Sequence, residues 1–147
     1  MISNTQWNML SAVTSVTEGE LHGDDPSHVL HVMNFALHDN RRLLDSAVDI
    51  IDDHDFPVKQ YCCDASGRSF YKVQGSQGRE YICLGEYCNC ASFLQTARQL
   101  QKNVICKHLL CVKISLALGK VVVHSITEEM FVDMLCEDSH AHGYDKY

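Results

Sequence analysis

The hydrophobic pattern changes its period along the chain and so divides it into regions. In residues 1–56, apolar side chains recur every three or four positions, which is the spacing of one face of an α-helix. Asp25 followed by Pro26 is typical of a helix start, because Asp caps free N–H groups and proline tolerates the first helical position. The predicted helices of this region are residues 4–17, 26–37 and 43–51.

From Pro57 the period changes to two, and β-branched and aromatic residues alternate with polar ones. Glycine-containing turns at residues 64–67 and 75–78 separate the alternating runs. The pattern therefore predicts a three-stranded antiparallel meander. Its strands are residues 58–63, 68–74 and 80–85.

Helical spacing returns after the meander, and Gly119 is placed to end one of the helices. The predicted helices are residues 91–100, 106–118 and 128–135. Residues 121–123 form a short apolar run, and Ser125 or Thr127 is expected to cap the last helix. The polar tail, residues 137–147, is expected to be mobile. The fold class is α+β, divided into a helical region (1–56), a central module (57–120) and a C-terminal helix with its tail (121–147).

Charge follows the same division. Residues 1–56 carry a net charge of −8, residues 57–120 carry +6, and residues 121–147 carry −5, which together give −7. A basic centre between acidic flanks indicates a surface for an acidic partner, either a protein or a nucleic acid. The side chains that could touch single-stranded DNA there are Lys59, Arg68, Lys72, Arg79, Tyr71 and Tyr81.

The chain carries eight cysteines, and its N-terminus lacks the basic and apolar parts of a signal peptide. No apolar run approaches the roughly 20 residues that cross a bilayer. We therefore expect a cytosolic or nuclear protein, where thiols stay reduced and cysteines serve metal binding or packing.

Two tight pairs of metal-ligating residues stand out among these cysteines. The sequence reads Cys-Asn-Cys, fifteen further residues, and then Cys-Lys-His. Three thiolates and one imidazole are the donor set of a closed tetrahedral zinc site. The predicted ligands are Cys88, Cys90, Cys106 and His108. The alternative is that they are buried thiols and a core histidine, since free cysteine is often buried.

Other candidates are weaker. His28 and His31 share one helix face without a third ligand, so we interpret them, like His38, as solvated. The acidic run over residues 52–55 lacks the glycine and spacing of a calcium loop. Cys62 and Cys63 point to opposite faces of a strand and cannot easily join one metal. No general base stands beside a ligand histidine, and no phosphate loop or nucleophile elbow is present. The zinc is therefore predicted to be structural, and the protein not to be an enzyme.

The ligand pairs, followed by Leu109 and Leu110, resemble the signature of the SWIM-type zinc finger family. The order Ser66-Gly67-Arg68, Tyr71, Val73, Tyr81 and Cys83 before them is similar to the small SWIM subunit of Shu-type homologous-recombination complexes. The resemblance covers about residues 45–118. It implies a nuclear protein that pairs with a RecA-like recombinase paralogue and helps recombinase filaments to assemble on single-stranded DNA.

One position departs from that family. The motif tends to have alanine three residues after the histidine, and this chain has Cys111. On a helix Cys111 lies one turn beyond His108, so it either packs as a small apolar residue or competes with His108 as a ligand. A second hypothesis for the function also stays open. The protein could be a freestanding zinc finger that binds single-stranded nucleic acid directly through its basic centre.

Overall fold

A computed structural model of the chain describes residues 26–100 and 104–141. The helix predicted over residues 4–17 lies outside the described residues. The helices are α2 (Pro26–Ala36), α3 (Arg41–Asp53), α4 (Ala91–Leu100), α5 (Lys107–Ala117) and α6 (Glu128–Ala141), with a 3-10 turn, η1 (Ser76–Gly78). The strands are β1 (Val58–Cys63), β2 (Ser69–Gln74), β3 (Glu80–Leu84), β4 (Tyr87–Cys88) and β5 (Val121–Ile126). No helix among the described residues is long and apolar enough to cross a membrane.

The strands form one sheet in the order β4-β3-β2-β1-β5. The predicted meander is confirmed as β1, β2 and β3, which pair antiparallel. The sheet is larger than the sequence indicated, because β4 extends it at one edge and β5 at the other. β5 pairs parallel to β1, from Val58 with Val121 to Cys63 with Ile126. The sheet therefore continues past residue 120, where the central module was predicted to end.

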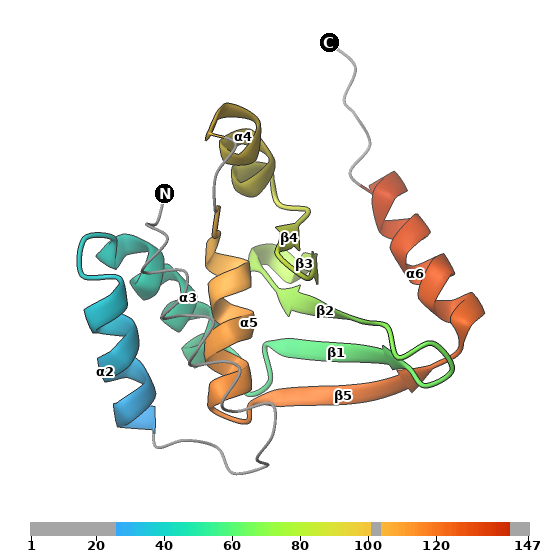
Figure 1. Ribbon diagram of the computed structural model, residues 1–147, viewed down its shortest axis with the longest axis horizontal. Helices are drawn as coiled ribbons and strands as arrows, with labels where there is room; N and C mark the ends of the chain where they lie inside the picture. The colour runs from blue at the N-terminus through green and yellow to red at the C-terminus, as the bar shows by residue number, and fades with distance from the viewer. Residues whose placement is uncertain (1–25, 101–103, 142–147) are drawn as a thin grey trace.

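The main core lies where one face of the sheet meets α3 and α5 (Figure 1). Val58 and Val73 come from the sheet, and Leu110 and Ile114 come from α5. α5 is buried on most of its surface and ends in a Schellman motif around Gly119, whose φ is 66°. There the Lys120 N–H donates to the Ser115 carbonyl at 2.8 Å. The prediction that Gly119 ends this helix is confirmed.

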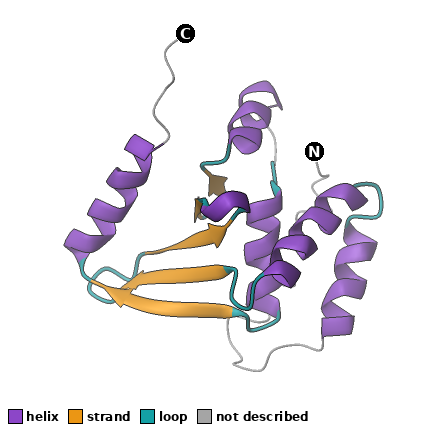
Figure 2. Cartoon of the chain, turned by 180° about the vertical axis from the view of Figure 1, so that it is seen from behind, coloured by secondary structure: helices purple, strands orange, loops and turns teal. Residues whose placement is uncertain are grey.

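A smaller core lies on the opposite face of the sheet, under the first turns of α6. It consists of Cys63, Phe70, Ile82 and Phe131. The ring of Phe131 meets that of Phe70 edge-on, with centroids 5.3 Å apart. From this contact α6 leads away from the sheet, on the side remote from α2 and α3 (Figure 2).

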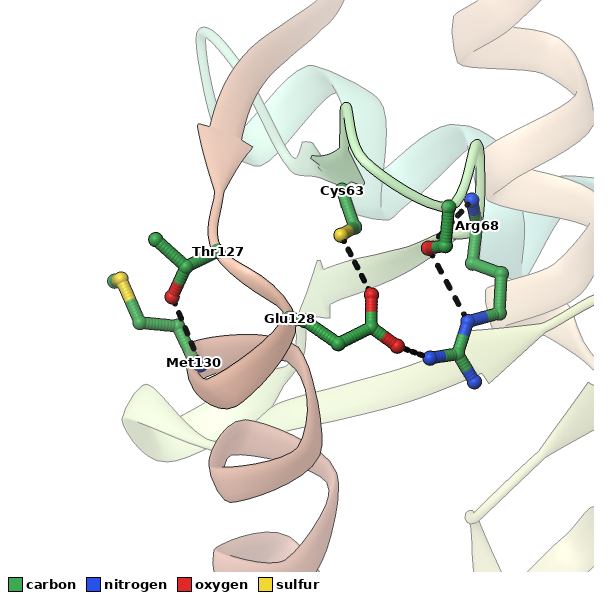
Figure 3. A network of polar contacts seen from close by, with 6 residues as sticks. Cys63, Arg68, Thr127, Glu128 and Met130 are labelled. Atoms are coloured by element: carbon green, nitrogen blue, oxygen red, sulfur yellow. Dashed lines mark hydrogen bonds and ion pairs between the residues drawn. The ribbon is translucent and has the colours of Figure 1, made fainter.

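Polar contacts fix the start of α6 (Figure 3). The Met130 N–H donates to Thr127 Oγ1 at 3.2 Å, so Thr127 caps the helix as predicted. Glu128 forms an ion pair with Arg68 and accepts a hydrogen bond from the Cys63 thiol at 2.9 Å. The helix continues to Ala141, so the prediction of a mobile tail from residue 137 was wrong for residues 137–141. Acidic residues in its first turn favour the helix, and no glycine or proline interrupts it.

Candidate metal centre

Each predicted ligand lies at the boundary of an element. Cys88 ends β4, and Cys90 directly precedes α4, where its Sγ accepts from the Phe93 N–H at 3.3 Å. Cys106 is the N-cap of α5, and its Sγ accepts from the Leu109 N–H at 3.5 Å. His108 is the second residue of that helix. Both one-residue spacings therefore work because the chain changes direction there, from strand to helix and from loop to helix.

Asn89 holds the first pair of cysteines in place. Its Oδ1 accepts from the Ile82 N–H at 2.9 Å, and its own N–H donates to the Ile82 carbonyl at 3.1 Å. These two hydrogen bonds to β3 fix the tight turn, so that both neighbouring thiols face inward. The sequence interpretation gave this asparagine no role, although a residue between two close ligands is a natural place for such a bond.

The structure brings the four predicted ligands together. Their donor atoms all lie within 4.8 Å of one another. His108 Nδ1 lies 3.8 Å from the Cys88 Sγ and 4.0 Å from the Cys106 Sγ. Zinc–sulfur and zinc–nitrogen bond lengths imply donor separations of about 3.5–3.8 Å around a tetrahedral ion. The two measured separations are near these values, so the four residues, called the Cys3His cluster below, suit a zinc ion. The cluster is buried, with exposed fractions between 0% and 5%.

Electrostatics favour a cation in this cluster. Hydrogen bonds with Cys88 and Cys90, and then burial, raise the pKa of Cys106 far above its ordinary value. Hydrogen bonds from Cys106 and Cys88 lower the pKa of Cys90. The three thiols thus share their protons, because burial and mutual repulsion prevent three free thiolates in so small a volume. A bound dication would remove that repulsion and release the protons.

The histidine ring is oriented by its neighbours. Nδ1 faces the thiols, and the ring stacks on Tyr81 with centroids 4.0 Å apart. Gly75 makes this stack possible, since a Cβ at that position would lie 2.4 Å from the Tyr81 ring. The sequence placed Gly75 in a turn and Tyr81 on a DNA-binding surface, and it gave neither the role of positioning His108. His108 Nε2 is buried and has no hydrogen-bond partner among residues 26–100 and 104–141.

Cys111 lies outside the cluster. It is buried in the main core and contacts the hydroxyl of Ser115 at 3.9 Å. Burial raises the pKa of its thiol to about 11, which keeps it neutral at ordinary pH. In the structure Cys111 therefore packs as a small core residue.

The weaker candidates form no further metal cluster within residues 26–100 and 104–141. His28, His31 and His38 are exposed, as are Asp52 and Asp53. Three of the four cations that the sequence placed on a DNA-binding surface form ion pairs. Lys59 and Lys72 lie 3.5 Å and 3.9 Å from the carboxylate of Glu80, and Arg68 pairs with Glu128.

Comparison with known proteins yields relatives that share one name. Proteins named "Zinc finger SWIM domain-containing protein 7" from Mus musculus and Danio rerio are each 31% identical to this chain. The matches span 96 and 97 residues, or 64% and 65% of this chain, and 63% and 67% of the relatives. A homologue with that name from Dictyostelium discoideum is 40% identical over 53 residues. These residues are 35% of this chain and 34% of the homologue's length. No family model and no solved structure matches.

The buried Cys3His cluster, set between a strand and two helix starts, defines a zinc-finger protein of the closed, structural type. The named relatives specify which one. This chain belongs to the SWIM-type zinc finger family, as the spacing of its ligand pairs predicted. The match spans slightly less than two thirds of the mouse relative's length.

Proposed function

We propose that the protein is a non-catalytic, nuclear adaptor for homologous-recombination DNA repair. It binds a RecA-like recombinase paralogue and promotes recombinase filament assembly on single-stranded DNA. The observation that carries the proposal is the buried Cys3His cluster in a chain of the SWIM family. The assignment to homologous recombination rests on the resemblance to the SWIM subunit of recombination complexes.

The chemistry of the cluster supports a scaffold rather than a catalyst. A catalytic zinc keeps one coordination position open to water or substrate. Here four protein donors surround one point, and all four residues are buried. Three thiolates would also leave the metal a weak Lewis acid. Zinc in this place would join β4 to the starts of α4 and α5.

The surface offers a protein partner apolar contacts away from the metal. On α6, Met130 and Val132 are 49% and 48% exposed. Among the described side chains of this helix, those that pack against the sheet lie in its first turns. Large exposed apolar side chains on a projecting helix suit a protein interface better than a solvated surface. We therefore include α6 in the proposed docking surface for the recombinase paralogue.

The test is affinity purification of the tagged full-length chain from nuclear extract, with metal analysis of the purified protein. We expect one zinc per chain and a partner with a RecA-like ATPase fold. Cys106→Ser should lose both the zinc and the partner. Cys136→Ser, which changes an exposed cysteine of α6, should keep the zinc. Val132→Asp should keep the zinc and weaken partner capture. Normal recombination in cells that lack the protein would refute the proposal.

A further inference from the structure

A hollow of about 460 Å³ lies beside the Cys3His cluster. The starts of α3, α4 and α5 contribute to its wall. The volume lies within the range of small-molecule sites and far exceeds what one ion occupies. Cys90, Cys106 and His108 of the cluster also line it, so the hollow directly adjoins the metal site and extends well beyond the space of one ion.

The polar groups around this hollow suit an anion. Arg42 and Lys107 contribute two cations, and Ser92 and Tyr81 contribute hydroxyls, whereas the Ser46 hydroxyl already donates to the Arg42 carbonyl at 2.7 Å. Among the described residues, no acidic side chain lines the hollow. Both cations are exposed, and neither takes part in an ion pair within the described part of the chain. The local potential is therefore positive, in contrast to the paired cations on the sheet.

Two helix starts add backbone donors. Ala91 and Ser92 of α4, and Lys107 and His108 of α5, all line the hollow. The thiolate acceptors of the cluster already take the third N–H of each helix, at Phe93 and Leu109. The first two N–H groups of each helix have no partner within a helix, and the helix dipole makes them favour an anion.

A buried atom points independently to a ligand. His108 lines the hollow and is 3% exposed, yet its Nε2 has no hydrogen-bond partner. With zinc on Nδ1, Nε2 carries the proton, and metal-ligating histidines almost always donate that proton to an acceptor. Within the described residues no acceptor is placed for it, so a bound water between this atom and a ligand in the adjoining hollow would satisfy it.

We propose that this hollow binds a phosphate group of single-stranded DNA, with Arg42, Lys107 and the first N–H groups of α4 and α5 as its donors. The choice of DNA rests on the proposed function. The choice of phosphate rests on the two unpaired cations, the two helix starts and a volume that also accommodates the attached nucleoside. A protein carboxylate would use few of these donors and leave most of the hollow empty.

The test measures binding of the full-length, zinc-loaded chain to a twelve-residue oligothymidylate, with and without a 5′-phosphate. The variant is Arg42→Gln combined with Lys107→Gln. Its matched control is Arg98→Gln combined with Lys120→Gln, which removes the same charge at two exposed positions outside the hollow. We expect the variant to weaken binding about tenfold and to reduce the salt dependence, and the control to change affinity less than about threefold. Zinc content should be unchanged in both.

The two oligonucleotides distinguish the source of the phosphate. Tighter binding of the phosphorylated one assigns the hollow to a strand end, and equal binding assigns it to an internal phosphodiester. An equal loss of DNA affinity in the variant and the control would overturn the proposal, because it would show that only the net charge of the protein matters. Binding of oligoglutamate but not of DNA would also overturn it. Capture of the recombinase paralogue is measured separately, so the adaptor proposal stands or fails independently of this site.

Discussion

The two cores of the molecule are stabilised by different means. On one face of the sheet, α5 is buried on most sides and begins at the Cys3His cluster. On the other face, α6 is held by a four-residue core, a capping hydroxyl and an ion pair whose side chains are about half exposed. Metal and extensive burial therefore fix the first region, whereas a small core and a few polar contacts hold the second. The first region suits a scaffold, and the second suits a surface that adapts to a partner.

The largest expected effect comes from removing the metal. Cys106→Ser, or a strong chelator, should unfold β4, α4 and α5, because structural zinc sites contribute roughly 10–16 kcal/mol in finger peptides. Zinc analysis and circular dichroism before and after chelation measure this. Retention of native helix content without zinc would show that burial alone holds the first region.

The second effect concerns the small core. Phe131→Ala should cost about 3–5 kcal/mol of local stability, since it removes a buried ring that packs on Phe70. Hydrogen exchange should then accelerate in α6 while α5 stays protected. Bound zinc should remain at one per chain, and its loss would mean that the two cores are coupled.

Cys111 gives a pH-dependent test within the first region. Its pKa is raised to about 11 by burial, so the neutral thiol stabilises the fold below the unfolded value of 9.0. That contribution is lost as pH rises from about 9 to 11, and amounts to roughly 2–3 kcal/mol over the two units. Urea unfolding should therefore show wild type losing stability relative to Cys111→Ala across this range. A constant difference would contradict the burial of the thiol, and loss of zinc from the variant would show it to be a ligand.

The smallest effect is expected at the ion pair. Arg68→Gln should cost less than about 1 kcal/mol, because exposed ion pairs contribute little in water. Thermal unfolding in low and high salt measures it, and the wild-type advantage should shrink as salt rises. A cost of several kcal/mol would show that the ion pair between Arg68 and Glu128 stabilises α6 far more than its exposure indicates.

Local pattern was sufficient for much of this fold. Alternation predicted β1, β2 and β3, and the run from Pro26 predicted α2, because these signals depend on neighbours in the sequence. β5 was missed since its pairing with β1 is parallel and distant in sequence, and since it offers only a short apolar run before His124 and Ser125.

The candidate site shows the same limit. The ligands could be selected from their spacing, because tight pairs of thiols and imidazole carry a chemical meaning of their own. The residues that position these ligands could not be predicted in the same way, since the stack of Tyr81 on His108 joins a strand to a helix across the core. The hollow lined by Arg42 and Lys107 likewise exists only after three helices have met.

The parallel pairing of β5 with β1 has a consequence for how the chain matures. β5 follows α5 in the sequence, so it can reach β1 only after the whole segment that carries the Cys3His cluster has crossed over the sheet. Such distant contacts form late in folding. When zinc is scarce, we expect newly made chains to leave the edge of β1 uncovered, and an open strand edge recruits other strands. The supply of zinc would then control how much of the protein aggregates as it is made.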